Sequence, residues 1–441
     1  MVLLLLIIFL AIMLIGTPVG FAMGALTNIS FGILGGDQSM VAQKLFSGSD
    51  TYTSVCVLLF ILATDLMSVG GITSAIVNFC EKIVGHVKGG LAHVNVLASM
   101  LFAGLSGSAI ADASGLGPLE IQMMTDGGYD RDFSAAVTAA SAIIGPIIPP
   151  SNIMIIFAGA IGTVSVGKMF LAGAIPGILL GIAYMILCYF MAVKYNMPYR
   201  KKRSTLKEIM ASLWDTLPAL LLPVIIMGSI ISGICTATES SALAVAYALI
   251  ISLLKKRLTW KTFMESCIRS AKAAANVLFI IAVSTAMGWA ITTLQVAQTM
   301  AAFCLQFISS KFMFLLFMNV LLLILGMVLD ATPAILLMVP ILWTVAQTYG
   351  IDAIQFGIIM CLNLMIGNLT PPVGMMLFVI SNVGKVKLSN LYRSILPFVA
   401  VAIIVLLLVT YIPSFSRLSG RNTAFLHARY MGMLCSRSSP K

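Results

Sequence analysis

Apolar stretches follow one another along the whole chain and are separated only by short polar breaks. A helix that crosses a membrane needs about 20 apolar residues, so this chain is long enough to cross a bilayer about ten times. The pattern therefore predicts an all-α polytopic membrane protein and argues against a series of soluble domains.

The first interruption of this pattern lies at 104–115, after the apolar run 94–103. It is rich in Gly, Ala and Ser and contains Asp112. Glycine lets the backbone turn sharply, and a turn at membrane depth is tolerated only where it is buried in protein or lines a cavity. We expect the tip of a re-entrant hairpin here, with close packing of small residues between helices as the alternative.

The second interruption lies at 147–152 and contains Pro149 and Pro150. Two successive prolines remove two backbone N–H donors and break a helix. The freed carbonyl groups, together with Ser151 and Asn152, offer hard oxygen ligands to a small cation such as Na⁺, as in transporters with discontinuous helices. A simple proline kink is the alternative.

The second half of the chain repeats both kinds of interruption. The segment 326–333 follows the apolar run 314–325 and contains Asp330, and the segment 367–374 contains Pro371 and Pro372. An ionisable residue in an apolar setting is a functional hypothesis by default, so we expect Asp330 to act in a hairpin tip. A helix N-cap is the alternative for Asp330.

An internal repeat connects these segments. One constant offset in residue number relates Gly128, Asp130, Gly145, Pro149 and Pro150 to Gly350, Asp352, Gly367, Pro371 and Pro372. The sequence therefore predicts two repeats, 1–195 and 215–413, each with scaffold helices, a hairpin and a broken helix. A basic cytoplasmic connection, 196–214, joins them, and an atypical basic tail, 414–441, follows. We expect this tail to be disordered and removal of 419–441 to leave transport intact.

The formal net charge of +11 comes largely from short loops near 194–207, 255–261 and 385–393. Short loops rich in Lys and Arg stay in the cytoplasm, so the charge indicates topology and not nucleic-acid binding. The resulting path starts the first repeat outside and the second inside. Inverted repeats are typical of secondary transporters; a duplication without transport is the alternative.

Composition excludes most other functions. Only 9% of the residues are charged, with 15 acidic residues and 3 histidines. No histidine pair has metal-ligand spacing, and the chain contains no phosphate-binding glycine loop or nucleophile elbow. The eight cysteines are scattered singly, as expected of small core residues. We therefore expect no enzyme and no organic cofactor, and no metal other than Na⁺. A channel is the alternative from another functional class, but a channel usually builds its selectivity filter from several symmetric subunits.

Two further polar features receive structural interpretations. In the segment 236–240, capping of a helix by Thr238 or Ser240 is favoured over contact with a substrate. Asp65 is interpreted as a packing residue.

The motifs at 102–108, 111–112, 128–130, 148–151, 176–177 and 370–374 together resemble the large membrane subunit of the tripartite ATP-independent periplasmic (TRAP) transporters, the DctM-like family. The resemblance covers residues 1–414. Ala237 departs from it, because the family usually has proline at that position.

The resemblance implies an elevator-type transporter of the bacterial inner membrane, in which a mobile domain with two hairpins carries an organic acid and Na⁺. It implies a separate small membrane subunit (DctQ-like) and a periplasmic substrate-binding protein (DctP-like). The implied substrates are C4-dicarboxylates, sialic acid and other sugar acids. A stand-alone Na⁺- or H⁺-coupled carboxylate carrier of related type is the alternative.

The candidate residues come from the four interruptions. The candidate Na⁺ ligands are Ser106, Gly107, Ser108, Asp112, Pro149, Ser151, Asn152, Gly326, Asp330, Thr332, Gly367, Thr370, Pro371 and Gly374. The candidate substrate-binding residues are Ser108, Ser151, Asn152, Asn368 and Thr370.

Overall fold

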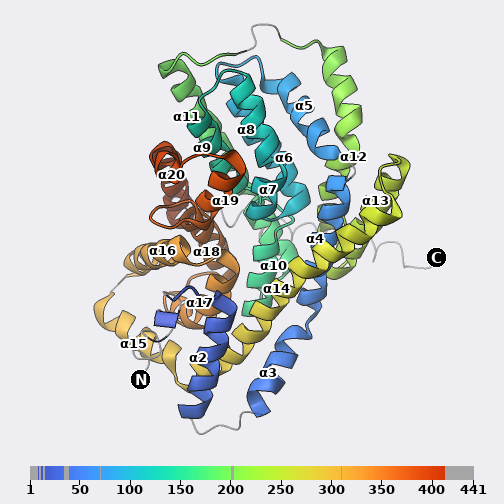
Figure 1. Ribbon diagram of the computed structural model, residues 1–441. Helices are drawn as coiled ribbons and strands as arrows, with labels where there is room; N and C mark the ends of the chain where they lie inside the picture. Colours follow the sequence, from blue (N-terminus) through green and yellow to red (C-terminus); the bar gives the residue numbers. More distant parts are fainter. Residues whose placement is uncertain are drawn as a thin grey trace, which may run out of the picture.

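The computed structural model describes residues 15–33, 39–69, 71–199, 203–308 and 310–412, together with residues 8, 11 and 12. The regular structure of these residues is entirely helical and forms an elongated bundle (Figure 1). The helices are α2 (Val19–Ile33), α3 (Ser39–Ser49), α4 (Tyr52–Val69), α5 (Ile72–Val84), α6 (Gly90–Ser106), α7 (Ala109–Gly115), α8 (Gly117–Asp126), α9 (Arg131–Ala142), α10 (Asn152–Ile161), α11 (Val166–Lys194), α12 (Leu206–Ile231), α13 (Ala237–Leu254), α14 (Trp260–Thr293), α15 (Val296–Phe307), α16 (Lys311–Val328), α17 (Ala331–Thr348), α18 (Ala353–Asn368), α19 (Met375–Gly384) and α20 (Leu388–Tyr411). Most of the predicted first span and the predicted basic tail lie outside the described residues.

Seven of the described helices are long and apolar enough to cross a membrane, or eight if the bent pair α3 and α4 forms one span. The seven are α11, α12, α13, α14, α16, α17 and α20. The sequence predicts about ten crossings from apolar length alone. Part of the difference arises because most of the first predicted span lies outside the described residues, and part because much of the apolar length lies in shorter helices, among them α6, α10, α18 and α19.

The structure confirms helix breaks at all four predicted positions. Gly107, in the left-handed conformation with φ 59°, ends α6, and the short helix α7 follows. The first proline pair lies in the non-helical segment 143–151 between α9 and α10. In the second half, residues 329–330 separate α16 from α17, and the segment with the other proline pair separates α18 from α19.

Local structure also repeats at the predicted offset. Gly128 and Gly350 both have positive φ, 86° and 63°. Two residues later, Asp130 caps α9 by accepting the N–H of Phe133 at 2.9 Å. Asp352 likewise caps α18. Equivalent positions of the two repeats therefore form the same turn and the same helix start.

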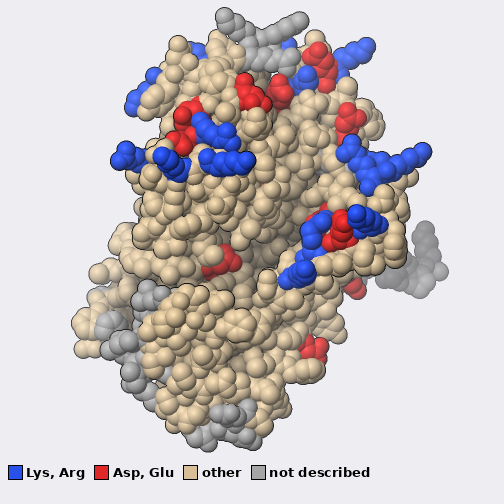
Figure 2. Space-filling view, viewed as in Figure 1, with Lys and Arg blue, Asp and Glu red and all other residues tan. Residues whose placement is uncertain are grey.

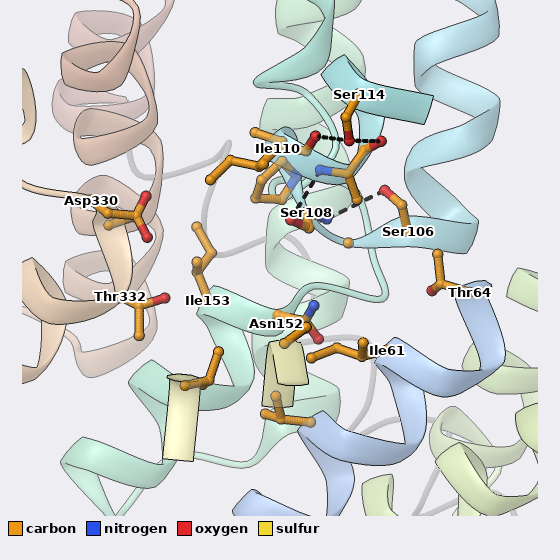
Figure 3. Close-up of a pocket in the computed structure, with 18 of the residues that line it drawn as sticks. Ile61, Thr64, Ser106, Ser108, Ile110, Ser114, Asn152, Ile153, Asp330 and Thr332 are labelled. Atoms are coloured by element: carbon orange, nitrogen blue, oxygen red, sulfur yellow. Dashed lines mark hydrogen bonds between the residues drawn. The ribbon is translucent and has the colours of Figure 1, made fainter. Parts of the chain in front are cut away.

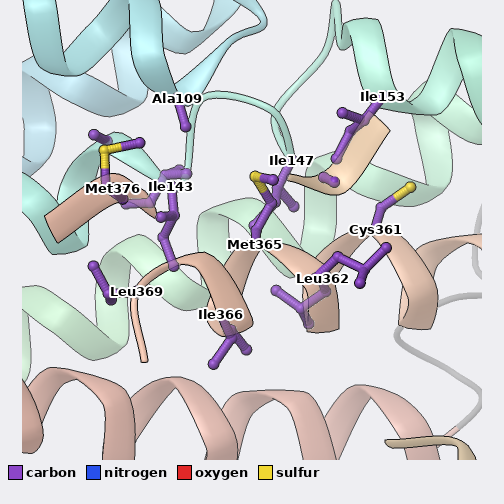
Figure 4. Close-up of a cluster of buried hydrophobic side chains, with 14 of the residues drawn as sticks. Ala109, Ile143, Ile147, Ile153, Cys361, Leu362, Met365, Ile366, Leu369 and Met376 are labelled. Carbon is purple, nitrogen blue, oxygen red and sulfur yellow. The ribbon is translucent and has the colours of Figure 1, made fainter. Parts of the chain in front are cut away.

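The two broken helices meet in the apolar core of the molecule (Figure 4). Ile143 and Ile147 come from the segment after α9, and they lie next to Met376 of α19 and Met365 of α18. All four side chains are at most 3% exposed. This core holds the polar interruptions of both halves against each other.

The distribution of charged side chains distinguishes the two ends of the bundle. Lys and Arg gather in the upper half of the view in Figure 2, and the lower half shows few charges. The basic residues around 255–257 and 385–387 follow α13 and α19 there. Because short basic loops stay in the cytoplasm, we expect the upper end to be the cytoplasmic one.

Candidate functional site

A cavity of about 610 Å³ lies between the interrupted helices of the two halves. Its walls come from the turn between α6 and α7, the start of α10, the break between α16 and α17, the end of α18, and the helices α4 and α14. Figure 3 shows Asp330 and Thr332 on one side, across from Ser108 and Asn152. Segments from both halves of the chain therefore converge on one cavity.

The first-half turn presents hydroxyl and backbone groups to this cavity. Ser106 Oγ donates a hydrogen bond to Asp112 Oδ1 and accepts the N–H of Ser108 at 3.3 Å. Ser108 caps α7 and lines the cavity. Asp112 is 1% exposed, does not line the cavity, and its Oδ2 has no hydrogen-bond partner among the described residues. The carboxylate therefore lies behind the turn, within reach of Ser106.

The hairpin tip and the broken helix of the first half are joined through their backbones. The carbonyl of Gly107 accepts the N–H of Asn152 at 3.4 Å. A Cβ atom on Gly107 would lie 2.5 Å from the carbonyl oxygen of Pro150, so this approach requires glycine. Ser151 is fully buried, caps α10 and donates to the carbonyl of Pro146. Pro149 is also outside the cavity lining, whereas Asn152 is part of it.

The second half brings a carboxylate to the cavity itself. Asp330 occupies the N-cap position of α17, as the alternative interpretation predicts, but its side chain makes no capping hydrogen bond. It accepts instead from Asn368 Nδ2 at 3.2 Å. Asn368 is 3% exposed, and its Oδ1 has no partner among the described residues. Asp330, Thr332 and Asn368 all line the cavity.

Several candidates of the second half serve helix packing. A Cβ atom on Gly367 would lie 2.6 Å from Gly326 Cα, so the two glycines let α16 and α18 pack closely. The N–H of Gly374 donates to the carbonyl of Met327 at 3.0 Å. Thr370 Oγ1 donates to a backbone carbonyl at the end of α18. These contacts hold the second hairpin against the second broken helix.

The structure thus divides the predicted site residues into two groups. Those that line the cavity are Ser106, Gly107, Ser108, Asn152, Asp330, Thr332 and Asn368. Those that lie behind it are Asp112, Pro149, Ser151, Gly326, Gly367, Thr370, Pro371 and Gly374. Within the described residues, no three His, Cys, Asp or Glu side chains are grouped so that they could hold a metal ion.

An ion pair at the cavity is missing from the predicted set. Arg269 on α14 donates from Nη2 to Asp65 Oδ2 at 2.9 Å and from Nε to Oδ1 at 3.3 Å. Both residues line the cavity. Asp65, interpreted above as a packing residue, therefore forms an ion pair at the cavity wall. The signal in the sequence was a charge within an apolar helix, which is rare and usually functional.

The interpretation of the segment 236–240 needs a smaller correction. The residue that caps α13 is Thr236 and not Thr238 or Ser240. Its hydroxyl accepts the N–H of Glu239 at 3.3 Å, and the carboxylate of Glu239 accepts the N–H of Thr236 at 2.7 Å. None of these residues lines the cavity, so the structural interpretation is right in kind and wrong in residue.

Sequence reasoning also missed a buried polar network beneath the first hairpin. Ser99 donates to Glu120 Oε1 at 3.4 Å, and Asn95 Oδ1 accepts from Ser141 at 2.7 Å. The hydroxyls of Ser99 and Ser141 are themselves 3.0 Å apart. Buried polar groups normally have such partners. The network therefore accounts for polar residues inside α6 and α9, which carry no motif in the sequence.

Comparison with known proteins gives a consistent result. Residues 6–415 match the family described as the DctM component of the tripartite ATP-independent periplasmic transporters. The chain is 42% identical over 406 residues to the sialic acid TRAP transporter large permease protein SiaM of Vibrio cholerae, covering 91% of this chain and 94% of that protein. It is 39% identical to the C4-dicarboxylate TRAP transporter large permease protein DctM of Pseudomonas aeruginosa, covering 85% and 88%.

The fold also resembles a solved transporter structure. The YdaH transporter of Alcanivorax borkumensis superposes with a TM-score of 0.64, covering 85% of this chain and 87% of the other. Only 12% of the residues are identical, so this likeness concerns the fold alone.

Proposed function

The chain belongs to the DctM-component family of the TRAP transporters, and we propose that it imports an organic acid together with Na⁺. With its membrane-spanning helices, this family membership makes it a multi-pass protein of the bacterial inner membrane. The proposed activity is transport, without a chemical reaction on the substrate. The observation that carries the proposal is the convergence of Asp330 and both hairpin tips on one cavity.

The coupling ion is proposed from the oxygen atoms at the two hairpins. Asp330 brings a negative charge to the cavity, and the oxygen of Asn368 beside it has no other partner among the described residues. A cation that binds both oxygens would balance this charge in an apolar setting. In the first half, Ser106 and the unpaired oxygen of Asp112 offer a second set of hard ligands.

The carried molecule is proposed to be a carboxylate. Ser108, Asn152 and Thr332 present hydroxyl and amide groups to the cavity, and such groups donate hydrogen bonds to a carboxylate. The relatives in Vibrio cholerae and Pseudomonas aeruginosa are named for sialic acid and for C4-dicarboxylates. Both names describe anionic organic acids, so we propose this substrate class without choosing one member.

The proposed mechanism depends on where the cations would bind. Each cation would bind where a hairpin meets a broken helix, and it would thereby order the cavity wall that receives the carboxylate. Such coupling is reciprocal, so the carboxylate must also tighten the binding of Na⁺. We propose that the hairpins move as an elevator, that a small membrane subunit completes the scaffold, and that a periplasmic binding protein delivers the substrate.

Reconstitution tests the proposal. Uptake of labelled sialic acid, C4-dicarboxylates and sugar acids would be measured in proteoliposomes, with and without an inward Na⁺ gradient. A cognate small subunit and a cognate binding protein would each be present or omitted. We expect accumulation only with all three proteins and Na⁺. Na⁺-driven uptake without the binding protein would instead identify a stand-alone carrier, and uptake that ignores the Na⁺ gradient would contradict the proposed coupling.

A further inference from the structure

One wall of the cavity carries a positive charge that the proposed mechanism does not use. The long helix α14 lines the cavity with Arg269, Ser270, Ala273 and Asn276. Among the described residues that line the cavity, Arg269 is the only Lys or Arg. A guanidinium group is the side chain best suited to bind a carboxylate through paired hydrogen bonds.

The surroundings of Arg269 leave its guanidinium accessible. Its side chain is 54% exposed, although it pairs with Asp65 and also donates to Ser266 Oγ at 3.1 Å. A guanidinium group has further N–H donors beyond those that these bonds use. Asp65 is 25% exposed and comes from α4, the other helix of this wall. A carboxylate in the cavity can therefore reach the guanidinium of Arg269, whose charge Asp65 otherwise balances.

A second observation points to the same place. The neighbouring Ser270 lines the cavity and is 3% exposed, yet its Oγ has no hydrogen-bond partner among the described residues. A buried hydroxyl without a partner is costly. The guanidinium of Arg269 and this hydroxyl are adjacent in sequence and line the same cavity, so both can donate hydrogen bonds to one anion.

The position of the pair along the membrane is also informative. Arg269 is nine residues from Trp260, where α14 begins after the basic cytoplasmic loop. At about 1.5 Å per residue, its backbone lies about 14 Å along the helix from that end. An arginine at this depth normally requires an acidic partner or an aqueous cavity, and Arg269 has both.

We infer that Arg269 and Ser270 form a carboxylate subsite on the α14 wall of the cavity, at which the substrate competes with Asp65 for the guanidinium. The inference rests on the proposed function, because the anion is the carried organic acid. Asp65 neutralises Arg269 while the cavity is empty. A bound carboxylate draws part of the guanidinium away from Asp65 and gains a hydrogen bond from Ser270.

A purely structural role would give a different pattern of mutant effects. If the ion pair only fastened α4 to α14, the loss of either partner would weaken the protein and its ligand binding in the same direction. If Asp65 competes with the substrate, Arg269→Gln must weaken binding and Asp65→Asn must strengthen it. Asparagine keeps the size of Asp65 and one acceptor, so the loss of charge is the main change.

The test is the binding of labelled sialic acid and succinate to the full-length chain, purified with its small subunit in NaCl. We expect Arg269→Gln to raise Kd about tenfold, because hydrogen bonds between a guanidinium group and a carboxylate are stronger than those between neutral groups. Arg269→Lys keeps the charge and loses the geometry for paired hydrogen bonds. Its Kd should lie between that of Arg269→Gln and that of the wild type. Ser270→Ala should raise Kd, and Asp65→Asn should lower it.

Lys272→Gln is the matched control, because it removes a charge from an exposed position of α14 that does not line the cavity. It should leave Kd unchanged. Changes of Kd in the same direction in Arg269→Gln and Asp65→Asn would overturn the subsite, as would an unchanged Kd in Arg269→Gln with wild-type thermal stability. If the wild-type protein transports neither a carboxylate nor Na⁺, the proposed function and the subsite both fail; if it transports them and only the variants disagree, the subsite alone fails.

Discussion

The two hairpin tips occupy equivalent positions in the chain and present different chemistry to the same cavity. Ser108 and Asp330 are related by the offset of the internal repeat, and each stands at the N-cap of the helix that follows its break. Ser108 is neutral and caps its helix, whereas Asp330 makes no cap and accepts from Asn368. At the first tip the nearby carboxylate, Asp112, lies behind the turn, and its Oδ1 accepts a hydrogen bond from Ser106, which lines the cavity.

The equivalent glycines behind the tips differ in the same way. Gly145 and Gly367 are related by the same offset. A Cβ atom on Gly367 would meet the backbone of Gly326, whereas a Cβ atom on Gly145 would clash with Asp112 Oδ2. Both halves therefore have a break with a close approach at this glycine, but the carboxylate lies at the tip in the second half and in the layer beneath the tip in the first.

The largest effect should come from the carboxylate that lines the cavity. Asp330→Asn keeps the shape and removes the charge that is proposed to bind Na⁺. We expect the Na⁺ concentration for half-maximal uptake to rise about 10- to 100-fold, since hydrogen bonds to charged groups contribute about 1.5–3 kcal/mol and about 1.4 kcal/mol is a factor of ten. Uptake of the identified carboxylate into proteoliposomes at varied Na⁺ measures this.

Asp352→Asn is the control for this variant, because Asp352 is also the N-cap of a second-half helix but is exposed and outside the cavity. Its Na⁺ dependence should match the wild type. If the half-maximal Na⁺ concentration rose equally in both variants, the role of Asp330 would be helix capping, and the proposed difference between the two hairpin tips would be wrong.

The next effect concerns the carboxylate behind the first tip. If Asp112 acts through Ser106, then Ser106→Ala and Asp112→Asn break one unit, and each should raise the half-maximal Na⁺ concentration about tenfold. The double variant should raise the half-maximal Na⁺ concentration no more than the more affected single variant does, which corresponds to a coupling energy of about 1.4 kcal/mol. If the effects of the two single variants on the half-maximal Na⁺ concentration added up in the double variant, measured in the same uptake assay, the two residues would act separately.

How far the sequence predicts this arrangement depends on the kind of feature. The breaks could be predicted because proline pairs and Gly-rich turns act locally, and Gly107 shows this with its positive φ. The orientation of side chains could not be predicted in this way. Asp112 and Asp330 both lie near a break in an apolar stretch, and they differ in how they pack against distant segments. Arg269 and Asp65 are 204 residues apart, so no local pattern links them.

The roles of individual residues cannot be assigned from the sequence for a related physical reason. Small and hydroxyl residues near a break serve equally well as ligands, caps or packing surfaces. Ser151 and Thr370 are engaged in hydrogen bonds to the backbone, whereas Ser106 and Asn152 reach the cavity. Only the approach of the other half of the chain decides between these uses.

A third effect should separate stability from ion binding. Gly367→Ala places a methyl group against the backbone of Gly326 and should lower the free energy of unfolding by about 1–3 kcal/mol. Gly145→Ala should displace the carboxylate of Asp112 and should therefore also weaken the Na⁺ dependence of uptake. Thermal melting in detergent and the uptake assay, applied to both variants, measure the two properties separately.

Gly228→Ala on α12 is the control for both glycine variants, because its added methyl group would have no neighbour within 4 Å. It should melt at or slightly above the wild-type temperature, since alanine favours a helix over glycine. The melting temperature and the Na⁺ dependence of uptake could instead change to the same degree in Gly145→Ala and Gly367→Ala. That result would show that the two glycines have the same role.

The smallest effect should come from the carboxylate that caps α13. Glu239→Gln keeps an acceptor for the N–H of Thr236 and removes a charge at an exposed position outside the cavity. Exposed substitutions away from a site usually have little effect, so uptake and its Na⁺ dependence should stay within about twofold of the wild type. A loss that approaches that of Asp330→Asn would place α13 in the transport cycle, and the contrast between the two hairpin tips would then be insufficient to explain which carboxylates matter.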